Sequence, residues 1–233
     1  MRLTRLVALA LPALWSASVF GSNLITNGGF LAPTVTTSNE TSGCTLCAYD
    51  QTLQNIGDPN TIWSFTPNSG IVHDTSQFGN PNGLYGDTQA GFVQNTGAFS
   101  ETVNLAAGDY SLVFDAALRS TDVTKQDFEI ILDPGSANTI LASCTNSATA
   151  TCGALSSAYE TVVLNPFTVT GGTHTIEFVG TKSGAGVDAT AFINNVNLDA
   201  LGTTAIPEPQ TVLFVMPGLA LMAFGLWRRR RTA

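Results

Sequence analysis

An antiparallel β-sandwich, lying between an export signal and a membrane-spanning tail, is the architecture that this sequence predicts. Apolar and polar residues alternate with a period of two in several short segments between Phe99 and Leu198, which is typical of half-buried strands. Both ends of the 233-residue chain have the features of targeting segments, and about 180 residues remain between them. That length fits one all-β domain, residues 22–202.

The first 21 residues have the features of a secretory signal peptide. Two arginines precede an apolar run from Leu6 to Leu14, and small residues follow the run up to Gly21. The run is too short to cross ~30 Å of hydrocarbon as a permanent anchor. We therefore expect signal peptidase to remove residues 1–21, with Ala17-Ser18 as a competing cleavage site, and the rest of the chain to be exported.

Three segments of the central region show the alternation most clearly. Turn residues lie between or beside them, at Gly108-Asp109, Asp133-Pro134-Gly135 and Gly171-Gly172. Successive side chains of a strand point to opposite faces, so every second residue is expected to share one face. The residues predicted to do so are Tyr110, Leu112, Phe114, Ala116 and Leu118, then Phe128, Ile130 and Leu132, then His174, Ile176 and Phe178. We interpret His174 as a structural histidine, and the spacing of the strands favours a sandwich.

The predicted domain is acidic, although charged residues make up only 11% of the chain and hydrophobic ones 44%. It can therefore form a core while Thr, Ser, Asn and Gly cover its surface. Between the two ends lie three basic residues, Arg119, Lys125 and Lys182, and 16 acidic ones, a net charge of −13. Such a domain repels nucleic acid and anionic lipid, so no nucleic-acid partner is expected. Its acidity fits either solubility outside the cell or cation binding.

The C-terminal part of the chain combines a linker, an apolar span and a basic tail. The linker is 203–210 and contains Pro207, Glu208 and Pro209; the span is 211–227; and the tail is 228–233, with Arg228, Arg229, Arg230 and Arg231. At about 1.5 Å per residue the span is roughly 26 Å long, the short limit for a transmembrane helix. The arginines predict that the tail stays on the cytoplasmic side.

The triplet, the span and the arginine cluster, in this order, resemble the PEP-CTERM sorting signal of Gram-negative bacteria that make extracellular polysaccharide. The resemblance covers Pro207 to Ala233. It implies that exosortase, a transpeptidase-like enzyme of the membrane, recognises the tail and removes it, which places the mature domain at the cell surface or in a biofilm matrix. An ordinary single-pass anchor after a proline-containing linker is the alternative.

The two ends of the domain resemble the first and last strands of galactose-binding-like jelly rolls, a fold that many carbohydrate-binding modules share. The resemblance rests on Asn23 to Phe30 and Asp188 to Leu198, with Ile62 to Ser64, Gly91 to Gln94, Phe99 to Val103 and Gly171 to Ile176 in the same order between them. It implies two antiparallel sheets whose first and last strands lie close together.

The same resemblance implies a structural Ca²⁺, which many members of this fold family hold with an acid after the opening segment and an Asp in the closing one. Here Leu31 occupies the first position and Asn194-Asn195 the second. Amide oxygens can ligate Ca²⁺, but the loss of carboxylate charge weakens its binding. We therefore expect no cofactor and no metal site of the family type.

All four cysteines lie in the predicted exported domain, where an oxidising compartment favours disulfides. Four cysteines allow three connectivities. We favour Cys44 with Cys47 and Cys144 with Cys152, because each pair falls within one loop rich in small polar residues. A zinc site would need two more ligands and a different second spacing. A redox-active Cys-x-x-Cys would need a strand-to-helix setting, which the pattern does not predict.

The sequence favours a noncatalytic surface protein that binds polysaccharide. It contains no nucleophile elbow, no His-Glu-x-x-His motif and no phosphate-binding loop. The main aromatic candidate for stacking on a sugar face is Trp63, and Tyr49, Tyr85 and Phe92 could join it. Trp63 lies between Ile62 and Phe65, so it also fits a core position. A secreted glycoside hydrolase on the same fold is the alternative, since its two carboxylates leave no local motif.

Overall fold

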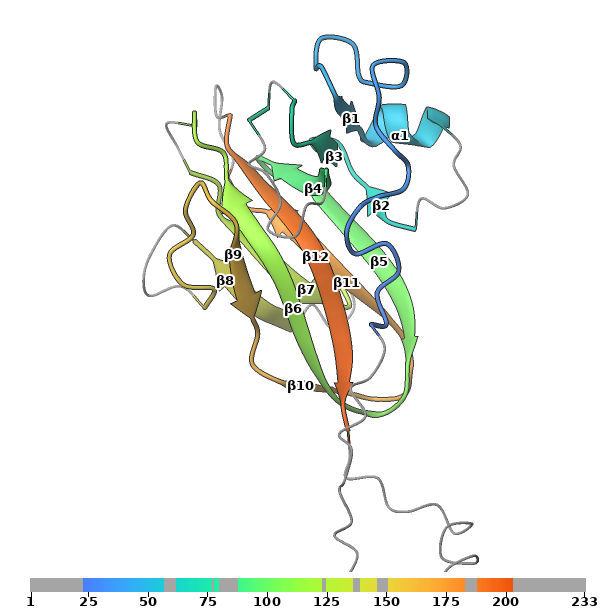
Figure 1. The fold of residues 1–233 in the computed structure, drawn as a ribbon. Helices are drawn as coiled ribbons and strands as arrows, with labels where there is room; N and C mark the ends of the chain where they lie inside the picture. The colour runs from blue at the N-terminus through green and yellow to red at the C-terminus, as the bar shows by residue number, and fades with distance from the viewer. Residues whose placement is uncertain are drawn as a thin grey trace, which may run out of the picture.

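The computed structural model describes residues 23–56, 62–76, 78–79, 88–122, 125–135, 139–145, 151–182 and 188–202. In these residues the chain forms two antiparallel β-sheets and one short helix (Figure 1). The elements in chain order are β1 (Cys47–Tyr49), α1 (Asp50–Ile56), β2 (Ser64–Phe65), β3 (Ser69–His73), β4 (Gln89–Gln94), β5 (Ala98–Leu105), β6 (Gly108–Leu118), β7 (Phe128–Leu132), β8 (Thr139–Cys144), β9 (Glu160–Val163), β10 (Phe167–Val169), β11 (Gly172–Gly180) and β12 (Thr190–Leu201). The predicted all-β class is confirmed.

The two sheets have different strand orders. The seven-stranded sheet runs β1-β3-β4-β12-β6-β10, and β9 also pairs with β6; the five-stranded sheet runs β2-β5-β11-β7-β8. Because β4 and β5 belong to different sheets, the short turn between them (residues 95–97) crosses from one layer to the other. Such crossings hold the layers together at the ends of the sandwich.

The main core lies between the two sheets, and it contains the side chains that the alternation predicts. All the apolar residues of the three predicted sets are buried in it: Tyr110, Leu112, Phe114, Ala116, Leu118, Phe128, Ile130, Leu132, Ile176 and Phe178. The rings of Phe99 and Phe178 stack with centroids 5.2 Å apart, and Phe114 meets Phe178 edge-on at 5.2 Å. Full burial of one such side chain contributes roughly 2–3 kcal/mol, so this core is the main source of stability.

His174 is buried between two acceptors, as a structural histidine should be. Its Nδ1 lies 2.8 Å from the Asp133 carboxylate, and its Nε2 lies 2.7 Å from the carbonyl oxygen of Thr170. Two acceptors require both ring nitrogens to donate, which favours the protonated ring, so the hydrogen bond to Asp133 raises the pKa of His174. The interpretation of His174 from the sequence is therefore confirmed.

The opening segment lies beside the closing strand, but it is not itself a strand. Leu24 N donates to Leu198 O at 2.9 Å, and Val196 N donates to Gly28 O at 3.0 Å. Gly28 lies in a turn from Asn27 to Phe30, which is closed by the hydrogen bond from Phe30 N to Asn27 O at 2.9 Å and has both of these residues in the left-handed region, and the chain leaves β12 after this turn. The expected proximity of the two ends is confirmed, whereas the expectation of a first strand is corrected, because the backbone leaves β12 after these two hydrogen bonds.

A second apolar cluster covers part of the outer face of the seven-stranded sheet. Phe92 of β4 and Phe192 of β12 point to this face because their neighbours Val93 and Ile193 point into the main core. The loop before β1 and the segment around Phe78 lie over them, so these rings are shielded from water. This outer cluster lies next to the candidate site described below.

Both predicted targeting segments lie outside the described residues. Residues 1–21, the triplet Pro207 to Pro209, the span 211–227 and Arg228 to Arg231 therefore remain predictions. In the part of the chain that the structure describes, no helix has the length and hydropathy needed to cross a bilayer.

Candidate functional site

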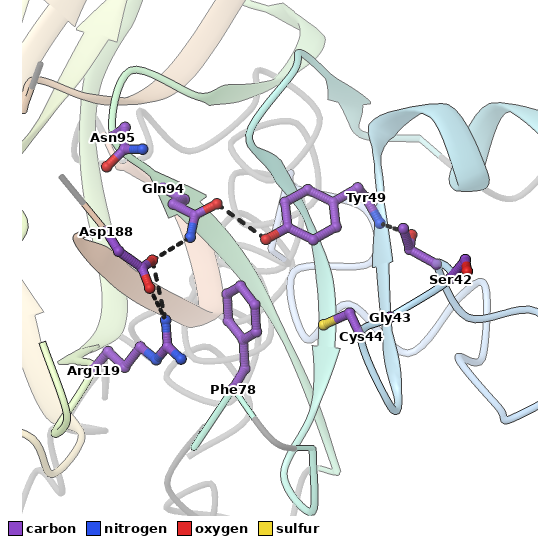
Figure 2. Close-up of a pocket in the computed structure, with 10 residues that line it drawn as sticks. Ser42, Gly43, Cys44, Tyr49, Phe78, Gln94, Asn95, Arg119 and Asp188 are labelled. Atoms are coloured by element: carbon purple, nitrogen blue, oxygen red, sulfur yellow. Dashed lines mark hydrogen bonds and ion pairs between the residues drawn. The ribbon is translucent and has the colours of Figure 1, made fainter. Parts of the chain in front are cut away.

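An open hollow of about 610 Å³ lies at one end of the seven-stranded sheet. We call it the end hollow. Its walls come from the loop Thr41–Cys44, from β1, from the end of β4 and from the segments that follow β6 and precede β12 (Figure 2). The side chains that face it are Tyr49, Phe78, Gln94, Asn95, Arg119 and Asp188. Five separate parts of the chain thus meet at this hollow: 41–49, Phe78, 94–95, Arg119 and Asp188.

A continuous chain of polar contacts crosses the end hollow. Tyr49 Oη donates to Gln94 Oε1 at 3.0 Å, and Gln94 Nε2 donates to Asp188 Oδ1 at 2.6 Å. Arg119 Nη1 then reaches both carboxylate oxygens of Asp188, each at 3.2 Å (Figure 2). Each planar group fixes the next, which restricts their rotamers before any ligand is present.

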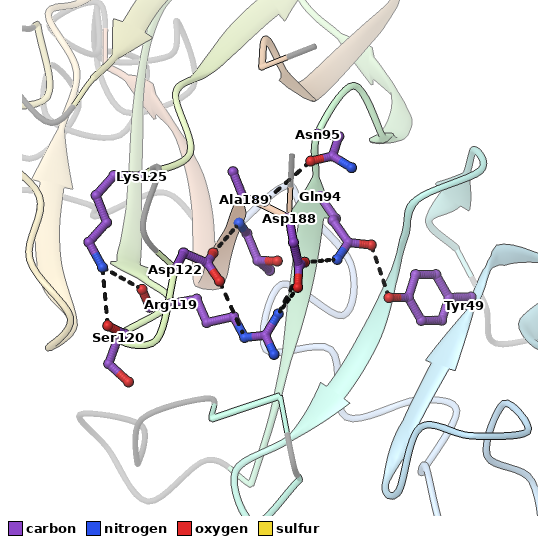
Figure 3. A network of polar contacts seen from close by, with 10 residues as sticks. Tyr49, Gln94, Asn95, Arg119, Ser120, Asp122, Lys125, Asp188 and Ala189 are labelled. Atoms are coloured by element: carbon purple, nitrogen blue, oxygen red, sulfur yellow. Dashed lines mark hydrogen bonds and ion pairs between the residues drawn. The ribbon is translucent and has the colours of Figure 1, made fainter. Parts of the chain in front are cut away.

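Behind this chain, Asp122 holds Arg119 from the protein side. Its Oδ1 lies 3.5 Å from Arg119 Nε, and its Oδ2 accepts a hydrogen bond from Thr190 N at 2.6 Å (Figure 3). Burial raises the pKa of Asp122, although the Thr190 hydrogen bond and the Arg119 charge counteract it. The Asp122 side chain is only 3% exposed, so it supports the site without facing the hollow.

Lys125 and Asn95 fix the backbone around the same network. Lys125 Nζ donates to the carbonyl oxygen of Arg119 at 2.8 Å, and Asn95 Oδ1 accepts from Ala189 N at 3.2 Å (Figure 3). The Asn95 contact uses the acceptor of its amide, which leaves the NH₂ group as the part that can donate to a ligand. These contacts fix the backbone at Arg119 and directly after Asp188.

One wall of the end hollow is aromatic. The Tyr49 ring packs edge-on against Phe92, with centroids 5.0 Å apart, and Arg119 Cζ lies 4.7 Å from the centre of the Phe78 ring. Burial raises the pKa of Tyr49 to about 12, with the Asp188 charge as the next cause. Tyr49 therefore keeps its hydroxyl proton at physiological pH and acts as a donor.

Both favoured disulfides are present. Cys44–Cys47 joins the loop at the rim of the end hollow to β1, with the two Cα atoms 5.6 Å apart. Cys144–Cys152 ties the end of β8 to the chain before β9, with the Cα atoms 5.0 Å apart. The predicted connectivity is confirmed, and the first bridge belongs to the candidate site.

Two of the aromatic residues predicted to bind sugar, Trp63 and Phe92, do not line the end hollow. Trp63 is 2% exposed, stacks on Phe30 with centroids 5.1 Å apart, and donates from Nε1 to the carbonyl oxygen of Asn27 at 3.1 Å. Phe92 is fully buried in the outer cluster. These two expectations are corrected: large rings on inward-facing positions serve packing, so neither presents a face to a sugar. Tyr85 lies outside the described residues.

Of the residues that face the hollow, only Tyr49 is among the aromatic candidates from the sequence. Gln94 was noted only as part of a strand resemblance. Arg119 and Asp188 belong to no motif, because 69 residues separate them in the chain. One signal was available: Arg119 is one of only three basic residues between the two ends of the chain.

The residues at the family-type Ca²⁺ position do not fit a hard cation. Leu31 offers no side-chain oxygen, and Asn194 Oδ1 already accepts a hydrogen bond from Asn195 N at 2.9 Å. The Asn195 amide donates to Asp115 at 2.8 Å. Among the described residues no cluster of three His, Cys, Asp or Glu side chains could hold a metal. We derive no role for Ca²⁺ at this position.

Comparison with known proteins gives structural neighbours only. No protein-family model matches the sequence, and no curated protein matches it significantly. Similar solved structures include a family 61 carbohydrate-binding module in complex with beta-1,4-galactotriose, at 16% identity and a TM-score of 0.42, covering 76% of this chain and 98% of that one. Another is the xylan-binding CBM22-1 domain of Paenibacillus barcinonensis Xyn10C, at 8% identity and a TM-score of 0.41, covering 60% and 86%.

A catalytic protein is also among the neighbours. An arabinose-bound GH51 α-L-arabinofuranosidase matches at 11% identity and a TM-score of 0.45, covering 77% of this chain but only 26% of the enzyme. Carbohydrate-binding modules recur among these similar structures. Every one of these TM-scores is below 0.5, so what this chain binds has to be inferred from its own residues.

Proposed function

We propose that this protein is an exported, noncatalytic β-sandwich that binds polysaccharide at the end hollow. The observation that carries the proposal is the convergence there of one carboxylate, one guanidinium, two amides and a tyrosine hydroxyl in an open depression. A sugar presents adjacent hydroxyl groups that both donate and accept, and such a set can satisfy them. Because the side chains already hold one another in place, little ordering entropy is lost on binding.

A binding role fits the carboxylates better than hydrolysis does. Glycoside hydrolases generally use two carboxyl groups on either side of the scissile bond, about 5 to 10 Å apart. Among the described residues that line the end hollow, Asp188 is the only acid. Asp122 lies behind Arg119 and is engaged by Thr190 N. The hydrolase alternative predicts release of reducing sugar from a bound polysaccharide, and we expect none.

A glycan array tests the proposal, followed by affinity measurement with Asp188→Asn and Tyr49→Phe variants of the chain. Loss of the Asp188 charge removes a charge-assisted acceptor, which should weaken binding at least tenfold, about 1.4 kcal/mol. Asp109→Asn is the matched control. Asp109 is an exposed acid at the start of β6 that accepts a hydrogen bond from Thr168 Oγ1, and it does not line the end hollow. If Asp188→Asn and Asp109→Asn bound sugar with equal affinity, sugar would not bind in the end hollow.

We also propose that the chain is exported and sorted as its ends predict, with signal peptidase removing residues 1–21 and exosortase recognising Pro207, Glu208 and Pro209. Two disulfides in the described domain support export, because such bonds persist in oxidising compartments. The mature form would then lie at the cell surface or in the matrix outside it. Intact mass spectrometry of the native envelope tests this, and a dominant full-length chain that retains Arg228 to Arg231 would contradict it.

A further inference from the structure

The charges in the end hollow point to a particular class of polysaccharide. We infer that the hollow selects neutral polysaccharide and discriminates against the acidic form of the same polymer. This inference rests on the proposed function, since it concerns the ligand of that same site. It depends on which of the two charged side chains, Arg119 or Asp188, is more exposed to solvent.

The positive charge in the hollow is already engaged. Arg119 Nη1 contacts both oxygens of Asp188 at 3.2 Å, and Asp122 Oδ1 lies 3.5 Å from Arg119 Nε on the buried side. The Phe78 ring covers one face of the guanidinium, with its centre 4.7 Å from Arg119 Cζ. A ligand carboxylate that approached Arg119 would also meet the exposed carboxylate of Asp188 beside it, so repulsion would offset the attraction of the guanidinium and little would be gained.

The negative charge is the one that faces the solvent. The Asp188 side chain is 63% exposed, whereas that of Arg119 is 17% exposed. The second nearby cation, Lys125, is engaged by the carbonyl oxygens of Arg119 and Ser120 and does not line the hollow. The described lining residues other than Arg119 and Asp188 carry no charge, and Tyr49 stays protonated. The site therefore offers a carboxylate acceptor to hydroxyl donors and repels a second carboxylate.

The charge of the whole exported part acts in the same direction. Its net charge of −13 repels a polymer that carries one negative charge per sugar. This long-range repulsion is screened over about 10 Å at 0.1 M salt, so discrimination should be strongest at low ionic strength. The contact with Asp188 is short-range and should persist at higher salt.

The experiment compares acidic polymers with their own carboxyl-reduced forms, which differ only at the uronate carbon. The probes are polygalacturonan, alginate and hyaluronan, each native and carboxyl-reduced, together with the neutral glycans bound on the array. The full chain, purified in detergent, is measured against each at 50 mM and 500 mM NaCl. We expect at least tenfold tighter binding of a reduced form than of its native form at 50 mM, with a smaller ratio at 500 mM.

A variant makes the inference specific to Asp188. In Asp188→Asn, Arg119 loses its exposed partner, so affinity for neutral glycan should fall while affinity for the native acidic polymers should rise severalfold. Asp109→Asn should leave both affinities unchanged. Native polymers that bind the wild-type chain as tightly as their reduced forms, or an Asp188→Asn variant with unchanged preference, would overturn the inference alone. Absence of binding to every neutral and reduced glycan would overturn the proposed function, and the inference with it.

Discussion

Glu101 is an acidic residue whose carboxyl group the fold buries between the two sheets. It occupies an inward-facing position of β5, between Phe99 and Val103, and is 2% exposed. Its Oε1 accepts a hydrogen bond from Thr26 N at 2.9 Å, while Oε2 is buried without a hydrogen-bond partner among the described residues. Burial raises the pKa of Glu101 to about 7. The folded state therefore prefers the protonated carboxyl group.

A Glu101→Gln variant should remove a pH-dependent loss of stability. The pKa is about 7 in the fold and 4.5 without it, so stabilisation is complete below pH 4.5 and is lost as the pH rises through 7. Near pH 8.5 the charged form costs up to roughly 3 kcal/mol, which an amide avoids. Urea unfolding of the chain at pH 5 and pH 8.5 measures this. We expect the variant to be more stable than the wild type only at the higher pH.

The control is Glu129→Gln, since Glu129 is a half-buried acid of β7 beside the inward-facing Phe128 and Ile130. This variant should follow the wild-type dependence of unfolding free energy on pH. If Glu101→Gln also followed it, the buried carboxyl group would not be the source of the effect.

Among the structural elements, the rim of the end hollow depends on a very short strand. β1 has three residues, and it contributes Tyr49 to the site. Thr41 secures the rim from both sides: its N donates to Cys47 O at 2.8 Å, and its Oγ1 accepts from Tyr49 N at 2.9 Å. The Cys44–Cys47 disulfide closes the same loop covalently. A three-residue edge strand has few other contacts to hold it, so this bridge should set how well the site is preorganised.

Replacement of Cys44 and Cys47 by serine should therefore weaken glycan binding. If the site must become ordered when the ligand binds, the binding free energy becomes less favourable by roughly 1–2 kcal/mol, which is a five- to thirtyfold weaker affinity. Replacement of Cys144 and Cys152 by serine is the matched control, because that bridge does not line the end hollow. It should lower the unfolding temperature and leave affinity within twofold. Calorimetric titration and thermal unfolding of both double variants test this, and equal affinities would contradict it.

The strands that the sequence predicted well are those with regular alternation. β6, β7 and β11 each place every second residue in the main core, so their inward faces could be predicted from the sequence, although both faces are buried at the end of β6 and in the last residues of β7. In β12 the period breaks: Ile193 and Val196 both enter the core although three positions separate them. A bulge between Asn194 and Asn197, with Asn195 in the left-handed region, accounts for the shift. No local propensity distinguishes such a bulge from a regular strand.

The candidate site could not be predicted for a different reason. Its residues come from separate segments that only the completed sheet brings together, and each is common on protein surfaces. Trp63 was a candidate for sugar binding because it is the only tryptophan between the two predicted targeting segments, yet a large ring also favours the core. The disulfides were predictable because each joins cysteines that are close in the chain. A contact between residues that are close in the chain can be predicted from the sequence, whereas a site built from distant segments is seen only in the folded structure.

At the scale of the whole molecule, the end hollow and the C-terminal end of the domain lie at opposite ends of the sandwich. β12 begins two residues after Asp188, which lines the hollow, and runs through 12 residues to Leu201. At roughly 3.3 Å per residue this strand is about 40 Å long, and Figure 1 shows it extending along the sandwich to the point where the described chain ends. A domain tethered through its C-terminus would thus hold the hollow away from the tether.

Immobilisation through single cysteines tests this geometry. Ala200→Cys places the attachment at the end of β12, and Thr96→Cys places it in the exposed turn after Gln94 and Asn95. The described residues contain no free cysteine to compete for coupling. We expect a surface coupled through residue 200 to capture polysaccharide and one coupled through residue 96 to capture little. Equal capture by both surfaces would place the binding site elsewhere on the molecule.

The tail itself yields the last prediction, which separates a sorting signal from a plain anchor. In the proposed sorting signal, residues 211–227 and the arginines that follow would supply membrane retention through hydrophobicity and charge, whereas Pro207, Glu208 and Pro209 would add nothing to insertion. Glu208→Ala should therefore block processing without releasing the chain, so that a heavier form accumulates in the membrane of a host that makes exosortase. Gln210→Ala, next to the triplet, is the control and should be processed normally. A plain anchor gives wild-type mass and location for both variants, and that result would leave a membrane-tethered β-sandwich in place of a sorted one.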